Sequence, residues 1–111
     1  MQGPLGELIE RLNAQNKVLS RSRLNYLDQE AQRKHFEATE VLASLGKSQA
    51  EKVTLAQSSE KWLSFHRELA KLESLYQFEL FKFKIMENEF LATYLECKQD
   101  GKDIDRAGKE S

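Results

Sequence analysis

His35, His66 and Cys97 are the residues of this chain whose side chains could most readily bind a metal or act as nucleophiles. A zinc site requires three or four such ligands that converge on one point. In the helix pairing derived below, His66 lies near Asp28 or Glu30, His35 lies elsewhere along the pair, and Cys97 is far from both. The sequence therefore predicts no metal site, no catalytic nucleophile and no cofactor.

Two further motifs contain residue types that occur in catalytic or phosphate-binding sites. Glu87 and Glu89 are two residues apart, and side chains at that spacing on a helix point in different directions. Hydrolysis by paired carboxylates needs two groups that face each other across a cleft. The run Gly46-Lys47-Ser48 is similar to the end of a phosphate-binding loop, but neither the earlier glycine nor a preceding strand is present. These patterns favour a protein that is not an enzyme.

The composition indicates one small helical domain. The 111 residues include one proline and 5 glycines, so few positions are expected to interrupt a helix. The formal net charge is −1, and acidic and basic residues alternate along the chain. Because proteins that bind the phosphate backbone usually carry a basic excess, nucleic-acid binding is disfavoured.

A single cysteine and the absence of long apolar runs bear on location. One thiol cannot form an internal disulfide, which favours a reducing, cytoplasmic environment. No stretch of about 18 apolar residues is present, so no membrane insertion is expected. The first ten residues also lack the basic start and apolar core of a signal peptide.

Two long helices separated by a short turn are predicted. The first covers residues 4–45, with an apolar or small residue at most steps of three or four. Gly46 is expected to end it in the left-handed conformation. Ser48 and Glu51 match a capping box that starts the next helix, so residues 46–48 form the turn. The stripe of the first helix is Leu5, Leu8, Leu12, Asn16, Leu19, Arg23, Leu27, Ala31, Lys34, Ala38, Leu42 and Leu45.

The second helix is predicted over residues 49–98. Its seam repeats every seven residues, which is typical of a coiled coil. Phe81-Lys82-Phe83-Lys84-Ile85 alternates like a strand, but the absence of turn signals favours a continuous helix. The seam comprises Leu55, Trp62, Leu69, Tyr76, Phe83, Phe90 and Cys97, with Phe65, Leu72, Leu80, Met86 and Tyr94 between them.

The predicted fold is all-α: two long antiparallel helices form a coiled-coil hairpin over residues 1–98, which dimerises into a helical bundle. Residues 99–111 carry many charges and one large apolar residue, so a flexible tail is expected. With the turn near Lys47, residue i of the first helix should face about residue 94 − i of the second. That register places Leu27 near Leu69 and Leu19 near Tyr76.

Three polar residues fall on the stripe of the first helix: Asn16, Arg23 and Lys34. They either fix the register of the helices or meet charges on a partner. Alternatively, the two basic side chains extend along the seam and keep their charged ends in water.

The region from Leu75 to Leu95 contains more large apolar side chains than one helical stripe can hold. An exposed apolar surface usually marks a protein partner, and large aromatic residues are the common energetic anchors of interfaces. The residues predicted to bind a partner are Tyr76, Phe78, Phe81, Phe83, Ile85, Phe90, Leu91 and Tyr94.

The leading functional hypothesis is a non-enzymatic protein-interaction module, in the form of a small helical chaperone or an assembly or adaptor protein that binds a partner helix. A purely structural coiled-coil homo-oligomer, such as a scaffold subunit, is the first alternative. A small helical subunit of a nucleic-acid complex is the second. Helical hairpins of this size recur among secretion chaperones, export-stalk proteins and scaffold subunits, but no shared motif carries a residue role over.

Overall fold

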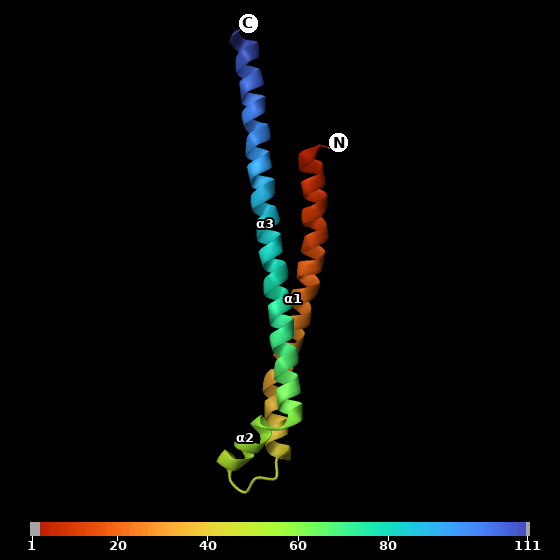
Figure 1. Cartoon of the computed structure of the whole chain (residues 1–111), viewed down its shortest axis with the longest axis vertical. Coiled ribbons are helices and arrows are strands. Elements are labelled where there is room, and N and C mark those ends of the chain that lie inside the picture. The colour runs from red at the N-terminus through yellow and green to blue at the C-terminus, as the bar shows by residue number, and fades with distance from the viewer. Residues whose placement is uncertain (1–2, 111) are drawn as a thin grey trace. The chain divides into compact units, whose positions relative to one another are not determined.

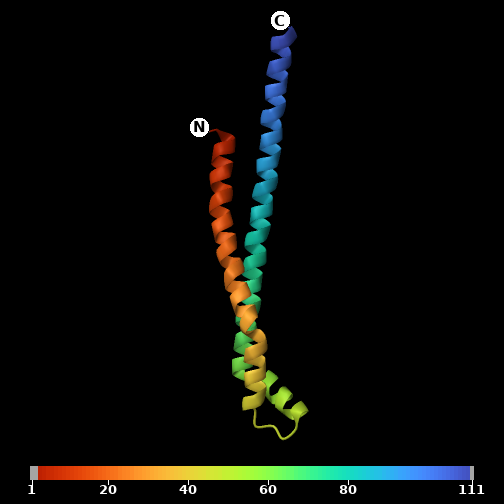
Figure 2. The same cartoon turned by 180° about the vertical axis from the view of Figure 1, so that it is seen from behind.

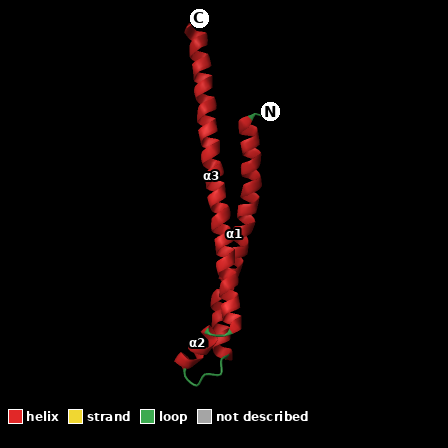
Figure 3. Ribbon diagram, in the orientation of Figure 1, coloured by secondary structure: helices red, strands yellow, loops and turns green. Residues whose placement is uncertain are grey.

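The computed structural model describes the backbone of residues 3–110 and the side chains of residues 3–100. Within that part of the chain there are three helices and no strand: α1 (Pro4–Ala43), α2 (Gln49–Gln57) and α3 (Glu60–Glu110) (Figures 1 and 3). The all-helical prediction is confirmed. The alternating run from Phe81 to Ile85 lies inside α3 and is helical.

The second predicted helix is interrupted after Gln57, so the expectation of two helices is wrong. Two serines make this break. The hydroxyl of Ser58 donates to the carbonyls of Thr54 and Leu55 at the end of α2. The hydroxyl of Ser59 accepts the backbone N–H of Trp62 at 3.2 Å, which caps the start of α3. Side-chain bonds of this kind compete with the helical backbone ladder and stabilise helix ends.

The connection between α1 and α2 follows the predicted signals with one difference. The hydroxyl of Ser48 accepts the N–H of Glu51 at 3.1 Å and caps α2, as expected. Gly46 is buried, but no described glycine has a positive φ, so the left-handed conformation predicted for it is wrong. A Cβ at Gly46 would lie 2.6 Å from the backbone nitrogen of Lys52. Glycine is therefore required because α2 approaches this position closely.

Contacts divide the chain into two compact units. The terminal unit comprises Met1–Leu19 and Glu79–Ser111. The connector unit comprises Ser20–Phe78 and includes α2. α1 and α3 each contribute to both units.

In the connector unit, α1 and α3 lie side by side and run in opposite directions (Figures 1 and 2). Tyr26 stacks on Tyr76 with ring centroids 5.9 Å apart, and Phe36 stacks on Phe65 at 4.2 Å. Leu69 of α3 is 8% exposed. Aromatic rings thus hold the helices of this unit together.

The register in the connector unit differs from the predicted one by about a heptad. Tyr76 was expected opposite Leu19, but its ring stacks on Tyr26, seven residues further along α1. The reason is the break at Ser58 and Ser59. Because α2 does not continue α3, more of the chain belongs to the connection, and the point where the direction reverses moves toward the C-terminus.

The inward stripe of α1 also differs from the predicted one after Leu12. Asn16, Arg23 and Lys34 are exposed, so they do not occupy the seam. The stripe chosen from the leucines drifts around the helix, whereas one row of less exposed positions alternates at three and four residues, which is the coiled-coil spacing. Glu30, Glu37 and Val41, also partly buried, lie beside this row. From Leu12 onward the row consists of Gln15, Leu19, Ser22, Tyr26, Gln29, Arg33, Phe36 and Glu40.

The predicted flexible tail, residues 99–111, lies largely outside the residues whose side chains the structure describes. The backbone of α3 is helical through Glu110. Flexibility of this segment stays a prediction.

Candidate partner-binding surface

The eight residues predicted to bind a partner all lie on α3, but they do not share one face. Three are half-buried: Tyr76, Phe83 and Phe90. Five are exposed: Phe78 (57%), Phe81 (63%), Ile85 (50%), Leu91 (55%) and Tyr94 (44%). The structure therefore separates the set into residues that contribute to internal packing and residues that remain in contact with solvent.

The ring of Tyr76 packs against its own chain, because it stacks on the ring of Tyr26 in α1. Partial burial raises the pKa of the Tyr26 hydroxyl above its usual value, and the nearby carboxylates of Glu73 and Glu30 raise it further. Loss of the phenolic proton is therefore disfavoured at this contact. A role of Tyr76 in binding a partner stays a prediction.

Phe83 and Phe90 belong to the terminal unit, where they line a shallow groove together with Leu12 of α1. Glu87, Asn88 and Leu91 complete the lining. The groove has a volume of about 420 Å³. The ring of Phe90 stacks on that of Tyr94 at 6.4 Å, so part of Tyr94 is also covered within the helix.

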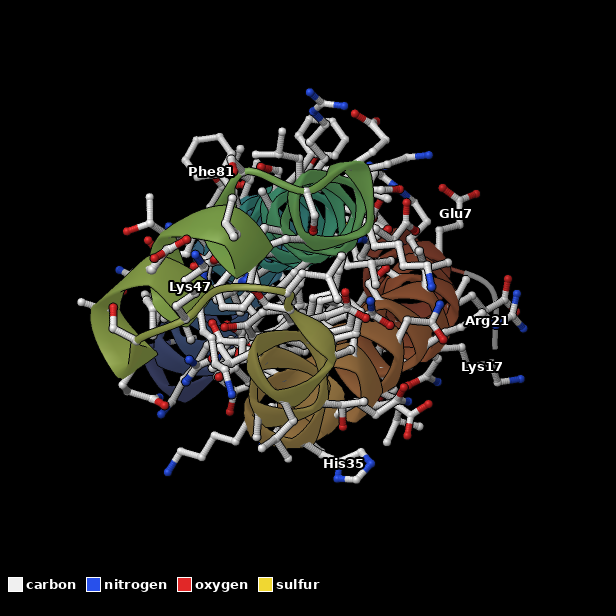
Figure 4. All side chains as sticks on the ribbon, turned by 90° about the horizontal axis from the view of Figure 1, so that it is seen from below. Glu7, Lys17, Arg21, His35, Lys47 and Phe81 are labelled. Carbon is white, nitrogen blue, oxygen red and sulfur yellow. The ribbon has the colours of Figure 1, made fainter. Side chains whose placement is uncertain are left out.

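A second stripe of the terminal unit points away from the internal seam. It starts at Phe81, which projects outward from α3 (Figure 4). Its members recur at steps of four and three residues, so they lie on one face of the helix. This outer stripe consists of Phe81, Ile85, Asn88, Ala92 and Leu95, all of which are exposed. Leu91 lies beside it, and both Asn88 and Leu91 also border the groove described above.

Polar contacts join the two helices of the terminal unit. Gln15 is 6% exposed, and its amide nitrogen donates to the backbone carbonyl of Glu79 at 3.1 Å and to its carboxylate at 2.6 Å. Lys82 approaches the same carboxylate at 3.6 Å. Arg11 and Glu89 form an exposed ion pair at 3.7 Å. Leu8, 7% exposed, is a buried apolar residue of this unit.

The connector unit contains an aromatic cluster that was not predicted as such. Phe36 contacts both Phe65 and Trp62, and the ring of Trp62 lies 5.1 Å from that of His66. Phe36 was missed because the predicted stripe of the first helix follows leucines. The strict three-and-four spacing that continues from Leu12 would have included it.

His66 approaches an acid, although not one of the predicted pair. Its Nε2 lies 3.2 Å from a carboxylate oxygen of Glu37 and is enclosed, but the two groups are not aligned for a hydrogen bond. Arg33 binds the other oxygen of Glu37 at 3.1 Å. Its 2.9 Å hydrogen bond to Glu30 is the main reason why the pKa of Arg33 is raised.

The remaining candidates for metal chemistry do not converge. His35 projects into solvent, and Cys97 is exposed (Figure 4). Among the described residues, no group of three or more histidine, cysteine or acidic side chains is arranged to hold a metal ion. None of the described helices combines the length and the apolar character needed to cross a membrane.

Comparison with known proteins adds no assignment. No protein-family model, no curated protein and no solved structure matches this chain. The functional interpretation therefore depends on the residues and contacts described above.

Proposed function

We propose that this chain is a non-enzymatic protein-interaction module that binds a helix of a protein partner through the exposed apolar face of α3, in the manner of a small chaperone or assembly adaptor. The observation that carries the proposal is the exposure of Phe81 and Ile85, at 63% and 50%, on one face of the terminal unit. Large exposed apolar surface is costly in water and usually marks an interaction site.

The arrangement of this face suits a helical partner. An amphipathic helix is recognised through anchors at steps of three, four and seven residues, and the outer stripe has that spacing. Phe81, Ile85 and Leu95 each expose on the order of 100 Å² of apolar surface. At about 25 cal/mol per Å², covering such a row would yield a gross gain of several kcal/mol.

The proposal includes a coiled-coil hairpin as the supporting scaffold. Most of the less exposed residues of α3 also alternate at three and four, which is the spacing of such a seam, and His66, Leu80 and Lys82 lie beside that row. A seam of this kind would use one face of α3 for its own chain and leave the outer stripe free for a second helix. These inward residues are Trp62, Phe65, Leu69, Leu72, Tyr76, Glu79, Phe83, Met86, Phe90 and Thr93.

Site-specific photocrosslinking in the native cell tests the proposal. A benzophenone amino acid replaces Phe81 in one variant and Lys17 in another. Lys17 is exposed on α1 of the same unit and projects outward without apolar neighbours of this kind (Figure 4). We expect a discrete protein adduct from position 81 and none from position 17, with the crosslinked peptide of the partner lying in a helix.

Equal or absent crosslinking at the two positions would contradict the proposal. Such a result would mean that the apolar face of α3 contacts solvent rather than a protein. Measurement of helicity by circular dichroism for both variants ensures that the comparison is made between folded chains.

A further inference from the structure

The outer stripe has a size pattern that fits a copy of itself. Phe81 is large, Ala92 is small, and the polar Asn88 lies between Ile85 and Ala92. We propose that the helix bound by the outer stripe is α3 of a second copy of this chain, in an antiparallel two-fold pairing centred near Met86 and Glu87. This inference rests on the proposed function and names its partner.

The size pattern determines the direction of the pairing. In an antiparallel pair centred there, Phe81 of one copy packs over Ala92 of the other, and the same contact repeats by symmetry. A parallel pair would place Phe81 on Phe81 and Ala92 on Ala92. One layer would then be crowded and another would contain a gap, both of which well-packed interfaces avoid.

Asn88 has a defined place in this arrangement. In the antiparallel register it lies close to the two-fold axis and next to Ile85 of the second copy. Asn88 of each chain can approach the other there, and a buried asparagine in a helical seam fixes register at some cost in stability. A polar residue at this point would therefore favour one register among several that bury a similar apolar area.

The available area matches what a dimer needs. Phe81, Ile85, Leu91 and Leu95 together expose roughly 400 Å² of apolar surface per copy, at about 100 Å² each. A standard interface buries about 800 Å² per partner, of which somewhat more than half is non-polar. Complete covering of these four side chains would therefore supply most of the non-polar area of a standard interface.

The test uses the purified full chain and a matched pair of variants. Ile85→Glu places a charge in the stripe, and Ile9→Glu places the same charge at an isoleucine of α1 in the same unit with similar exposure, 46% against 50%. Sedimentation equilibrium should show a dimer for the wild type and for Ile9→Glu. We expect Ile85→Glu to weaken dimerisation by about 100-fold or more, because the symmetric interface contains the change twice.

Cys97, the only cysteine, supplies an independent measure of direction. With a spin label on Cys97, the antiparallel dimer should give a distance of about 30 Å, since the two labels are separated by 21 residues of helix at a rise of 1.5 Å. A parallel pair would give less than about 20 Å, because the axes of packed helices are about 10 Å apart.

Three results would overturn the inference: a wild type that stays monomeric at every concentration, an Ile85→Glu variant that dimerises as well as Ile9→Glu, or the short Cys97 distance. None of these results removes the proposed function. A crosslink from position 81 to a different protein would retain the interaction module and reject the second copy as its partner.

Discussion

Replacement of Gln15 by leucine tests whether a buried polar contact stabilises the terminal unit. Gln15 is 6% exposed, and its amide nitrogen donates to both the backbone carbonyl and the carboxylate of Glu79, 64 residues away in sequence. The side chain of Glu79 is 14% exposed, so water has little access to replace the lost donor. Leucine fills a similar volume but removes the 2.6 Å hydrogen bond to this carboxylate, which keeps the longer 3.6 Å approach of Lys82.

The expected magnitude follows from these contacts. A hydrogen bond to a charged group contributes about 1.5–3 kcal/mol, and the additional apolar burial of leucine returns about 1 kcal/mol. Gln15→Leu should therefore lower the free energy of unfolding by about 0.5–2 kcal/mol. Gln32 is exposed on the same helix, so Gln32→Leu serves as a matched control. It should change the free energy of unfolding by less than about 0.5 kcal/mol.

The assay is urea unfolding followed by circular dichroism at 222 nm, at one fixed protein concentration because association would shift the midpoint. Glu79→Leu and the double variant complete a thermodynamic cycle. The double variant should approach or exceed wild-type stability, because removing both polar groups leaves no buried charge unpaired. Strict additivity, within about 0.5 kcal/mol, would refute the idea that the pair acts as a unit.

Three further changes test the connector unit, the turn and the effect of alkaline pH. Phe36→Ala should cost about 2–3 kcal/mol and shift the fluorescence of Trp62 to longer wavelength, because it removes half-buried ring contacts; an unchanged spectrum would contradict the cluster. Gly46→Ala should cost about 1–3 kcal/mol in a thermal melt, whereas Gly3→Ala, with no atom within 4 Å of its added Cβ, should be close to neutral. Because the pKa of Tyr26 is raised in the folded state, its contribution to stability is complete below pH 10.0 and is lost as the pH rises through the folded value. Tyr26→Phe should therefore keep its helical signal to higher pH than the wild type, and an identical alkaline transition would count against this contact.

Local signals for helix ends were partly readable from the sequence. Ser48 and Glu51 predicted the start of α2, because a capping hydroxyl followed by an acid three residues later is a specific pattern. Ser58 and Ser59 were not read as a break, since serines are common on exposed helix surfaces and become caps only when the backbone already turns. The register error followed from that omission, because the length of the connection sets which residues face each other.

The sequence identified the apolar residues of the candidate surface, but not which of them face α1 and which face solvent. The apolar excess of α3 is evident from the sequence alone, yet Tyr76 and Phe81 looked equivalent there. They differ only once the inward stripe is known, when Tyr76 lies against Tyr26 and Phe81 faces solvent. Phe36 illustrates the same point on α1, since its inward position follows from the spacing rather than from its residue type.

The inward stripe of α1 is partly polar, so packing of α1 against α3 buries little apolar surface and covering the outer stripe would add to the stability of the fold. Toward α3, α1 presents Gln15, Ser22, Gln29 and Arg33 at positions where a stable coiled coil carries aliphatic residues. None of the described side chains is less than 2% exposed, so the internal seam recovers only part of the apolar burial that its length would allow. The net free energy of folding of two helices packed in this way is therefore expected to be small. Covering the outer stripe would add burial on the face where α3 keeps Phe81 and Ile85, so folding and association of the terminal unit should be coupled. On this reasoning, a variant that weakens association, such as Ile85→Glu, should also lower the melting temperature, and the difference from wild type should grow with protein concentration.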